Sequence, residues 1–289
     1  MYMDSSLASS FAANVDWAYA GLVRTADPVP GPDLREMGLG GSLVYADELE
    51  GAGSILVVAA NIAGAASITA SADAGTQRQA VRDGVIDFLV SNLSEALRIL
   101  KNEIRKREPV AVCVAQPPEE LESDMAELGV LPDLLPPGAL NASRFEVFLD
   151  QGARQIAPVS AAKNQTILTW SVDRTPTRHL PKLDAIALDC LGANKTPITW
   201  PVRRWLRYAP RYMGRLAHEK RLVRCQTPVA RAFLNTVRGL VADGLLDVAV
   251  AIEMCSSGKS ESHQITPPSN RQRPEDSLLF PSGSFDPGP

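Results

Sequence analysis

The chain has 289 residues, a formal net charge of −4 and a sequence pI near 5.5. Hydrophobic residues make up 45% of it and charged residues 21%, which is typical of a globular protein and excludes a mostly disordered one. Its four cysteines lie far apart without a C-x-x-C pair, and only three histidines accompany them, so the pattern fits neither a disulfide framework nor a zinc site.

The first 37 residues are expected to form a partly disordered leader. Asp4 stands where a secretion signal needs positive charge, so the start predicts no export. Residues 27–33 contain three prolines, which fix the backbone and remove N–H donors. The most apolar stretch, residues 55–70, contains Asn61 and falls short of the roughly 20 residues that cross a bilayer. Together these features predict a cytoplasmic protein without a membrane partner.

Residues 38–138 are expected to form a Rossmann-like unit with a mostly parallel sheet. Short apolar runs alternate there with amphipathic stretches, which is the pattern of β-α units. One helix begins near Ser94, which can cap it, and ends before Pro109. A buried strand at residues 110–115 follows, and a further helix leads to a strand at residues 130–135. The predicted fold class is therefore α/β.

Residues 139–255 are expected to form a second α/β region, because apolar residues recur there at strand or helix spacing. The remaining residues, 256–289, are rich in Ser, Pro and Gly, which predicts a disordered tail. The expected strands of the second region are residues 166–172, 185–190, 222–225 and 246–252, and the expected helices are residues 202–216 and 228–241.

The helix at residues 202–216 is basic, with aromatic residues between its arginines. Such a pattern can bind nucleic acid through phosphate contacts and stacking. However, Trp205, Tyr208 and Tyr212 recur at three- and four-residue steps, which favours an amphipathic helix with a buried aromatic face. Because the net charge is negative, no nucleic-acid partner is expected. We interpret His218, in the same basic cluster, as a surface residue.

A glycine-rich turn is formed by Gly38, Leu39, Gly40 and Gly41, ahead of an expected helix. Backbone N–H groups in such a turn, together with a helix N-terminus, can receive a pyrophosphate. A dinucleotide fingerprint also needs a strand before the turn, and here a proline-rich segment precedes it. A cofactor-binding turn and a merely flexible turn are therefore both open interpretations.

Several short segments resemble the dinucleotide-binding domain of urocanase, the NAD-dependent urocanate hydratase of histidine degradation. The matching segments are GLGG at 38–41, AANIAGAASI at 59–68, DGVIDFLVSNLSEALR at 83–98, EPVAVCV at 108–114 and ELGVLPDLL at 127–135. They keep the family's order and spacing over about a third of the chain. The resemblance implies NAD as a cofactor, held at Gly38 to Gly41, and a homo-oligomer.

A second part of the chain resembles the C-terminal core of the same family. FLDQGARQIA at 148–157 is similar to its Y-G-N-N-I-R motif, and residues 222–254 are similar to its strand-turn-helix segment. By this resemblance Arg154 and Cys225 are the catalytic residues. Cys225 precedes a helix N-terminus, which could lower the pKa of its thiol, whereas a free cysteine is also commonly a buried apolar residue.

The departures from the urocanase pattern concern the polar groups. Where the family has G-G-A-Q, this chain has residues 43–50, which add Asp47, Glu48 and Glu50. These carboxylates would repel a phosphate, and they are otherwise interpreted as a solvated face rather than a metal site. Where the family has G-N-A-A-E, the chain has residues 116–120, in which two prolines replace flexible N–H donors.

Three functions remain open on these grounds. The first is a shortened, divergent urocanase relative that keeps a nucleotide-sized cleft for NAD or another small molecule, with reduced or lost hydratase activity. The second is a non-catalytic protein-binding or assembly subunit. The third is an active urocanate hydratase, a lyase, that works with substituted residues.

Overall fold

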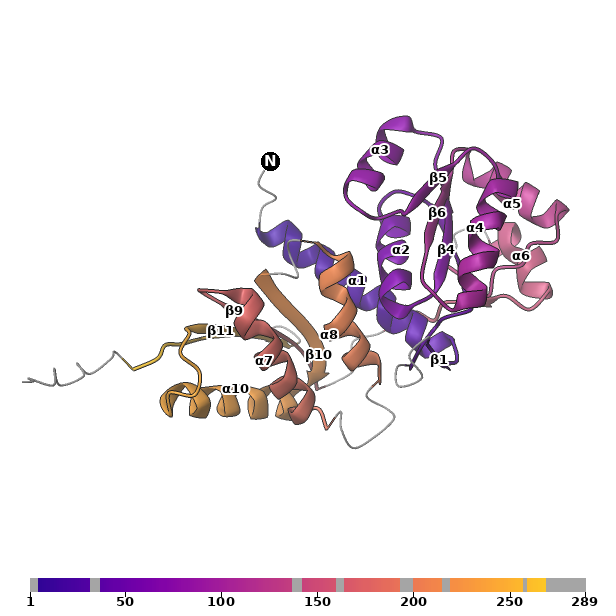
Figure 1. The fold of residues 1–289 in the computed structure, drawn as a ribbon. Coiled ribbons are helices and arrows are strands. Elements are labelled where there is room, and N and C mark those ends of the chain that lie inside the picture. Colours follow the sequence, from indigo (N-terminus) through magenta and orange to yellow (C-terminus); the bar gives the residue numbers. More distant parts are fainter. Residues whose placement is uncertain are drawn as a thin grey trace, which may run out of the picture.

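The computed structural model of the chain describes residues 5–31, 37–136, 142–159, 164–192, 200–214, 219–256 and 259–268. These residues form two lobes, each built on its own β-sheet (Figure 1). One sheet has six parallel strands and the other has four antiparallel strands. A two-stranded ribbon, β1 (Val29–Pro30) and β2 (Met37–Gly38), leads into the first lobe.

The six-stranded sheet confirms the predicted Rossmann-like α/β fold. Strands β4 and β6 are buried on both faces, because helices cover both sides of the sheet. Their residues are accordingly apolar or carry only a small hydroxyl group. The predicted strand at residues 110–115 is confirmed as β6. In spatial order the strands are β5 (Phe88–Val90), β6 (Ala111–Val114), β4 (Ala66–Ala70), β3 (Leu43–Glu48), β7 (Leu134–Leu135) and β8 (Arg154–Gln155).

Helices cover both faces of this sheet, as βαβ crossovers require. Val44 and Cys113 belong to the hydrophobic cluster on one face, whereas their neighbours Tyr45 and Val112 belong to the cluster on the other. The first face is covered by α1 (Ser5–Thr25), α2 (Ala52–Ala63) and α3 (Ala74–Arg82), and the second by α4 (Leu93–Lys106), α5 (Pro118–Glu127) and α6 (Ala142–Asp150).

The start of α4 differs from the sequence prediction by two residues. Asn92, and not Ser94, caps the helix, because its side-chain oxygen accepts the N–H of Glu95 at 3.0 Å. Ser94 is already inside the first turn. The helix ends at Lys106, and its C-cap, Arg107, adopts a left-handed conformation (φ 62°) two residues before Pro109.

The antiparallel lobe has strands and helices at most of the positions expected within residues 139–255, but α6 and β8, at the start of that range, belong to the parallel lobe. One expected strand is wrong. Residues 185–190, expected as a strand, are the end of α7, because Leu180, Leu183 and Ala187 are buried at helical spacing. The expected strand at 246–252 begins later, at Val250. The sheet order is β10 (Lys220–Gln226), β9 (Gln165–Val172), β11 (Val250–Ser256) and β12 (Lys259–Ile265), packed with α7 (Pro176–Cys190), α8 (Trp200–Tyr212) and α10 (Thr227–Ala242).

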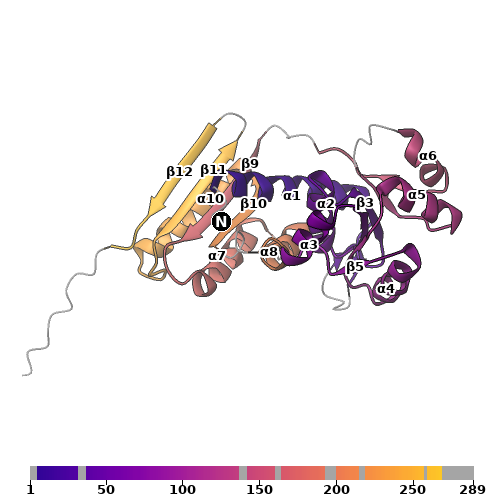
Figure 2. The ribbon, with the colours of Figure 1, turned by 90° about the horizontal axis from the view of Figure 1, so that it is seen from above.

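The expected leader contains the longest described helix of the chain. α1 runs from the antiparallel lobe to the parallel lobe and contacts both β10 and α2 (Figure 2). Val15, Tyr19 and Leu22 are buried along one side of it. Their spacing of four and three residues is typical of a helix. The prolines at residues 27–33 had instead favoured the prediction of a partly disordered leader.

The expected disordered tail begins with a strand. Residues 259–265 form β12, which pairs with β11 from Ile265 to Lys259. Only Ile265 of this strand is buried, so no apolar alternation marked it in the sequence. Residues 269–289 lie outside the described residues, and the prediction for them stays a prediction.

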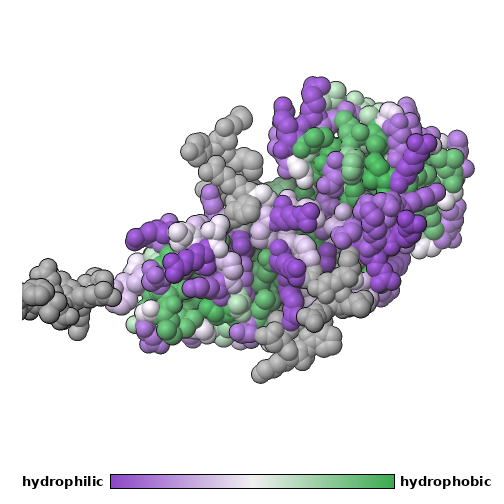
Figure 3. All heavy atoms as spheres, in the orientation of Figure 1, coloured by the Kyte–Doolittle hydropathy of each residue, from purple (hydrophilic) through white to green (hydrophobic). Residues whose placement is uncertain are grey.

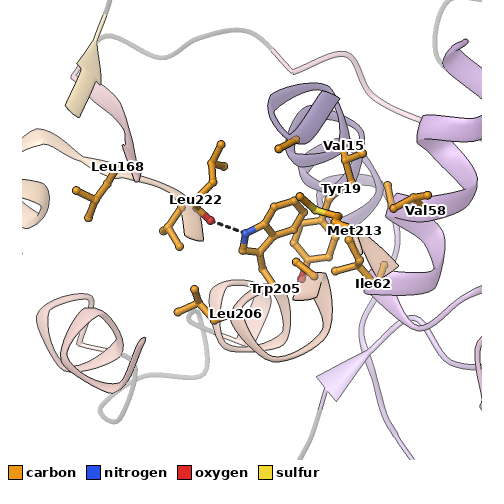
Figure 4. Packing of buried hydrophobic residues seen from close by; sticks show 14 of the residues in the cluster. Val15, Tyr19, Val58, Ile62, Leu168, Trp205, Leu206, Met213 and Leu222 are labelled. Atoms are coloured by element: carbon orange, nitrogen blue, oxygen red, sulfur yellow. Dashed lines mark hydrogen bonds between the residues drawn. The ribbon is translucent and has the colours of Figure 1, made fainter. Parts of the chain in front are cut away.

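The two lobes meet in an aromatic cluster between α1, α8 and β10 (Figure 4). The indole Nε1 of Trp205 donates to the carbonyl of Leu222 at 2.6 Å, so α8 covers the open edge of β10. The rings of Tyr19 and Trp205 pack against each other with centroids 5.2 Å apart and planes inclined by 50°, and the Tyr19 hydroxyl donates to the carbonyl of Pro201 at 2.7 Å. These contacts confirm that α8 is amphipathic, with its arginines Arg203, Arg207 and Arg211 exposed.

Candidate functional site

The glycine turn at Gly38 to Gly41 lies at the amino-terminal edge of the parallel sheet. It connects β2 to the strand β3, and not to a helix as the sequence predicted. The N–H of Leu39 donates to the carbonyl of Ala63 at 2.8 Å, and the Leu39 side chain is fully buried. Ligands of open α/β sheets bind at the opposite, carboxyl edge. The turn therefore lies on the wrong side of the sheet for a dinucleotide.

Protein atoms fill the space beside these glycines. A Cβ added to Gly40 would lie 2.6 Å from the carbonyl oxygen of Arg107, and one added to Gly38 would lie 2.8 Å from Nη1 of Arg204. The Arg204 side chain comes from α8, and its Nε donates to the carbonyl of Ile62 at 2.7 Å. Glycine is required at positions 38 and 40, because α8 and the C-terminal end of α4 pack against the turn too closely to leave room for a Cβ atom.

The glycine-rich turn at the carboxyl edge is a different one, between β3 and α2. Gly51 has φ 50° and ψ −107°, which L side chains rarely adopt. A Cβ on Gly53 would lie 1.8 Å from the carbonyl oxygen of Glu48, so only glycine fits there. Within the described residues no side chain caps the N-terminus of α2. The sequence signal was the G-x-G at residues 51–53, shortly after the β-formers Leu43 to Tyr45, but the more prominent GLGG drew the prediction instead.

Carboxylates surround this turn. Glu48 and Glu50 are exposed within it. Glu50 Oε1 accepts the hydroxyl of Thr76 at 2.7 Å, and Asp73 accepts the N–H of Thr76 at 2.6 Å. That backbone N–H holds the pKa of Asp73 below its ordinary value, so the carboxylate is charged at neutral pH. Negative charge at this helix N-terminus opposes the binding of a pyrophosphate.

The neighbouring turn, between β6 and α5, offers few donors. Pro117 is the N-cap of α5 and Pro118 its first residue, and neither has an N–H. Glu119 and Glu120 follow in the first turn of the helix. The side-chain amide of Gln116 donates to Asp124 at 2.9 Å and is thus already engaged. The residues at this edge therefore do not fit NAD, whose pyrophosphate needs several free donors.

Cys225 lies in the other sheet, near the end of β10. Its side chain is buried, and desolvation raises the pKa of its thiol to about 11. The suggested lowering of this pKa is wrong, because burial outweighs the effect of the following helix. A protonated thiol is a weak nucleophile, and buried free cysteines commonly pack as small apolar residues.

Arg154 lies on β8, the edge strand of the parallel sheet opposite to β5. Its guanidinium is 3.3 Å from the carboxylate of Asp27, and both side chains are largely exposed. Because Arg154 and Cys225 belong to different sheets, the structure does not bring the two expected catalytic residues together.

The two described histidines each lie near one carboxylate. His179 is buried on α7, and its Nε2 is 4.0 Å from Asp247. His263 lies on β12 beside Arg238, and its Nε2 is 3.7 Å from Glu261. His218 is outside the described residues. Among the residues that the structure describes, no three His, Cys, Asp or Glu side chains could hold a metal ion.

None of the helices within the described ranges combines the length and the apolarity that crossing a bilayer requires. A scan against protein-family models finds no match to the chain, and a search of curated proteins finds no significant match either.

Proposed function

We propose that this protein is a urocanase-like scaffold that has lost NAD-dependent hydration and serves as a non-catalytic assembly subunit. The observation that carries the proposal is the charge of the turn between β3 and α2. Glu48 and Glu50 stand where a pyrophosphate would approach the helix N-terminus, and Asp73 adds a third carboxylate nearby.

The state of the two expected catalytic residues supports the same proposal. Urocanase chemistry, as the resemblance implies it, needs NAD held beside groups that move protons. Cys225 is protonated and buried, and Arg154 is engaged with Asp27 at the far edge of the other sheet. Neither residue lies at the carboxyl edge of β3, β4 or β6.

An exposed apolar strand edge supports the assembly role. Among the described strands β5 pairs with β6 alone, and its Phe88 and Leu89 are 47% and 40% exposed. Val81 on the adjacent α3 is exposed as well, and hydrophobic side chains gather on the parallel lobe in Figure 3. Exposed strand edges of this kind pair with other chains. The partner we propose is a second copy, consistent with the oligomer that the resemblance implies.

Two measurements on the purified protein test the loss of NAD chemistry. After denaturation the supernatant is searched for released dinucleotide by its ultraviolet absorption, and we expect none. The native protein with added NAD is then mixed with urocanate, and the absorption of urocanate should stay constant. Released NAD, or a consumption of urocanate that disappears in Cys225→Ala, would overturn the proposal.

The assembly role has a separate test. Light scattering should give a molar mass above that of one chain, and Phe88→Asp should reduce it to one chain. Val147→Asp, on α6 at the other side of the lobe, is the matched control, because Val147 is exposed to 48% but lies away from β5. A monomeric unaltered protein, or an oligomer that persists in Phe88→Asp, would contradict this role.

A further inference from the structure

A hollow of about 180 Å³ lies where the two lobes join, between α1, α8 and β10. Its walls are almost wholly apolar, and an apolar cavity of about 150 Å³ can hold one benzene molecule. The hollow therefore has room for one small ligand. The residues that line it include Tyr19, Ala20, Val23, Val202, Trp205 and Val223.

The polar groups beside the hollow are engaged within the protein. The hydroxyl of Tyr19 donates to a backbone carbonyl of α8 at 2.7 Å, and the indole Nε1 of Trp205 donates to one of β10 at 2.6 Å (Figure 4). Asp16 and Arg224 form an ion pair. Nε and Nη1 of Arg224, which lie outside this pair, have almost no accessible surface, so a molecule in the hollow cannot reach them.

These engaged groups favour an apolar ligand over water. A water molecule typically keeps about three hydrogen bonds in a protein interior, whereas the groups beside the hollow already bind one another. Val23 and Val202 are only half-buried, so they still expose apolar surface. An apolar molecule in the hollow would remove this surface from water without breaking a hydrogen bond of the protein.

Charged ligands are disfavoured because no free charge faces the hollow from within the protein. Arg224 and Asp16, whose side chains are 10% and 9% exposed, neutralise each other. Arg24, which also lines the hollow, is exposed, so water and salt screen its charge. An ionic ligand would lose its own hydration without gaining a buried partner. The hollow therefore selects neutral molecules.

We propose that this hollow binds one small, neutral, apolar molecule of about the size of benzene or toluene. Its wall combines Tyr19 from α1, Trp205 from α8 and Val223 from β10, and small-molecule sites are common at such junctions. Because α1 contacts both β10 and α2, a bound molecule would stabilise the junction of the two lobes. The site is separate from the carboxyl edge of the parallel sheet and from β5, so it depends on neither part of the proposed function.

Toluene is a probe of that size and polarity. Scanning calorimetry of the full chain should show a Tm that rises with toluene concentration, because only the folded protein contains the hollow. Benzoate, which has a similar ring but a charged head, should leave the Tm unchanged at equal concentrations. No shift with toluene, or an equal shift with benzoate, would overturn the proposal.

Two alanine substitutions on α1 locate the binding. Ala20→Leu fills the hollow, and it should weaken toluene binding by about tenfold or more in titration calorimetry. Ala13→Leu makes the same change at a half-buried residue that does not line the hollow, so binding should be unaltered. Binding that survives in Ala20→Leu, or that is lost in both variants, would contradict the assignment.

Val202→Thr tests the apolar wall without filling the hollow. It keeps the size of the side chain but adds a hydroxyl group, and it should weaken toluene binding by about threefold or more. Val229→Thr is the matched control, because Val229 is also half-buried and also the third residue of its helix, directly after a proline, but does not line the hollow. Equal affinities in these two variants would show that toluene binds elsewhere.

Discussion

The two edges of the parallel sheet both carry glycine-rich turns, yet they differ in what surrounds the glycines. At the amino edge, Gly38 and Gly40 face arginine side chains and backbone at contact distance. At the carboxyl edge, Gly51 and Gly53 form the start of α2, which has no side-chain cap and lies beside several carboxylates. The comparison teaches that glycine content alone does not identify a phosphate site. The position on the sheet and the local charge decide it.

The largest expected effect concerns Gly53. Gly53→Ala places a Cβ on the carbonyl oxygen of Glu48, so strand and helix must separate, and we expect a loss of more than about 3 kcal/mol in the free energy of unfolding. Gly239→Ala in α10 is the control, because no atom lies within 4 Å of the added Cβ. It should be neutral or stabilising by up to about 1 kcal/mol. Denaturant titration measures both, and equal effects would contradict the packing described.

The next largest effect concerns Arg204 at the amino edge. Arg204→Met removes the donors to the carbonyls of Ile62 and Met37, and we expect a loss of about 2–3 kcal/mol. Arg211→Met, at an exposed position on the same helix, should change stability by less than about 0.5 kcal/mol. If both variants unfold at the same denaturant concentration, Arg204 does not hold α8 to α2.

A smaller effect should follow from neutralising the carboxyl edge. The double substitution Glu48→Gln and Glu50→Gln removes two negative charges and keeps acceptors for Thr76. Affinity for inorganic pyrophosphate should rise by about tenfold at low salt, and the gain should fade as salt is added. Glu119→Gln with Glu120→Gln, at the proline-blocked helix α5, is the comparison and should give a smaller gain. Equal gains would mean that the start of α2 has no special role.

The smallest effect concerns acid stability at the same edge. The folded-state pKa of Asp73 is depressed by the N–H of Thr76, so this carboxylate stabilises the fold above its unfolded pKa, ordinarily near 3.8. That contribution is lost as pH falls through the lower, folded value. Asn caps helices as well as Asp but does not titrate. The Tm difference between the unaltered protein and Asp73→Asn should therefore shrink below pH 4, and a constant difference would contradict the cap.

The sequence was sufficient for elements whose own residues determine them. The continuous apolar run at residues 110–115 forms β6, and the helix expected at residues 228–241 forms α10. The strand β12 could not be predicted, because its register comes from pairing with β11 and not from apolar spacing. The junction of the two lobes could not be predicted either, because it depends on contacts between residues far apart in the chain, such as Asp16 and Arg224.

The candidate site was only partly predictable, for a related reason. The carboxylates at residues 47–50 were identified from the sequence, and the structure shows Glu48 and Glu50 exposed beside the start of α2. Which of the two glycine turns lies beside these carboxylates depends on whether a strand or a helix follows the turn. A helix was expected after the turn at Gly38 to Gly41, but residues 43–48 form β3, so the turn lies at the amino edge of the sheet and not at the carboxyl edge.

Titration calorimetry of the full chain with NAD most directly tests whether the carboxyl edge has lost the dinucleotide. We predict no heat of binding up to millimolar NAD for the unaltered protein. Saturable binding of one NAD per chain, reduced at least tenfold by Gly51→Val at the start of α2, would contradict that loss.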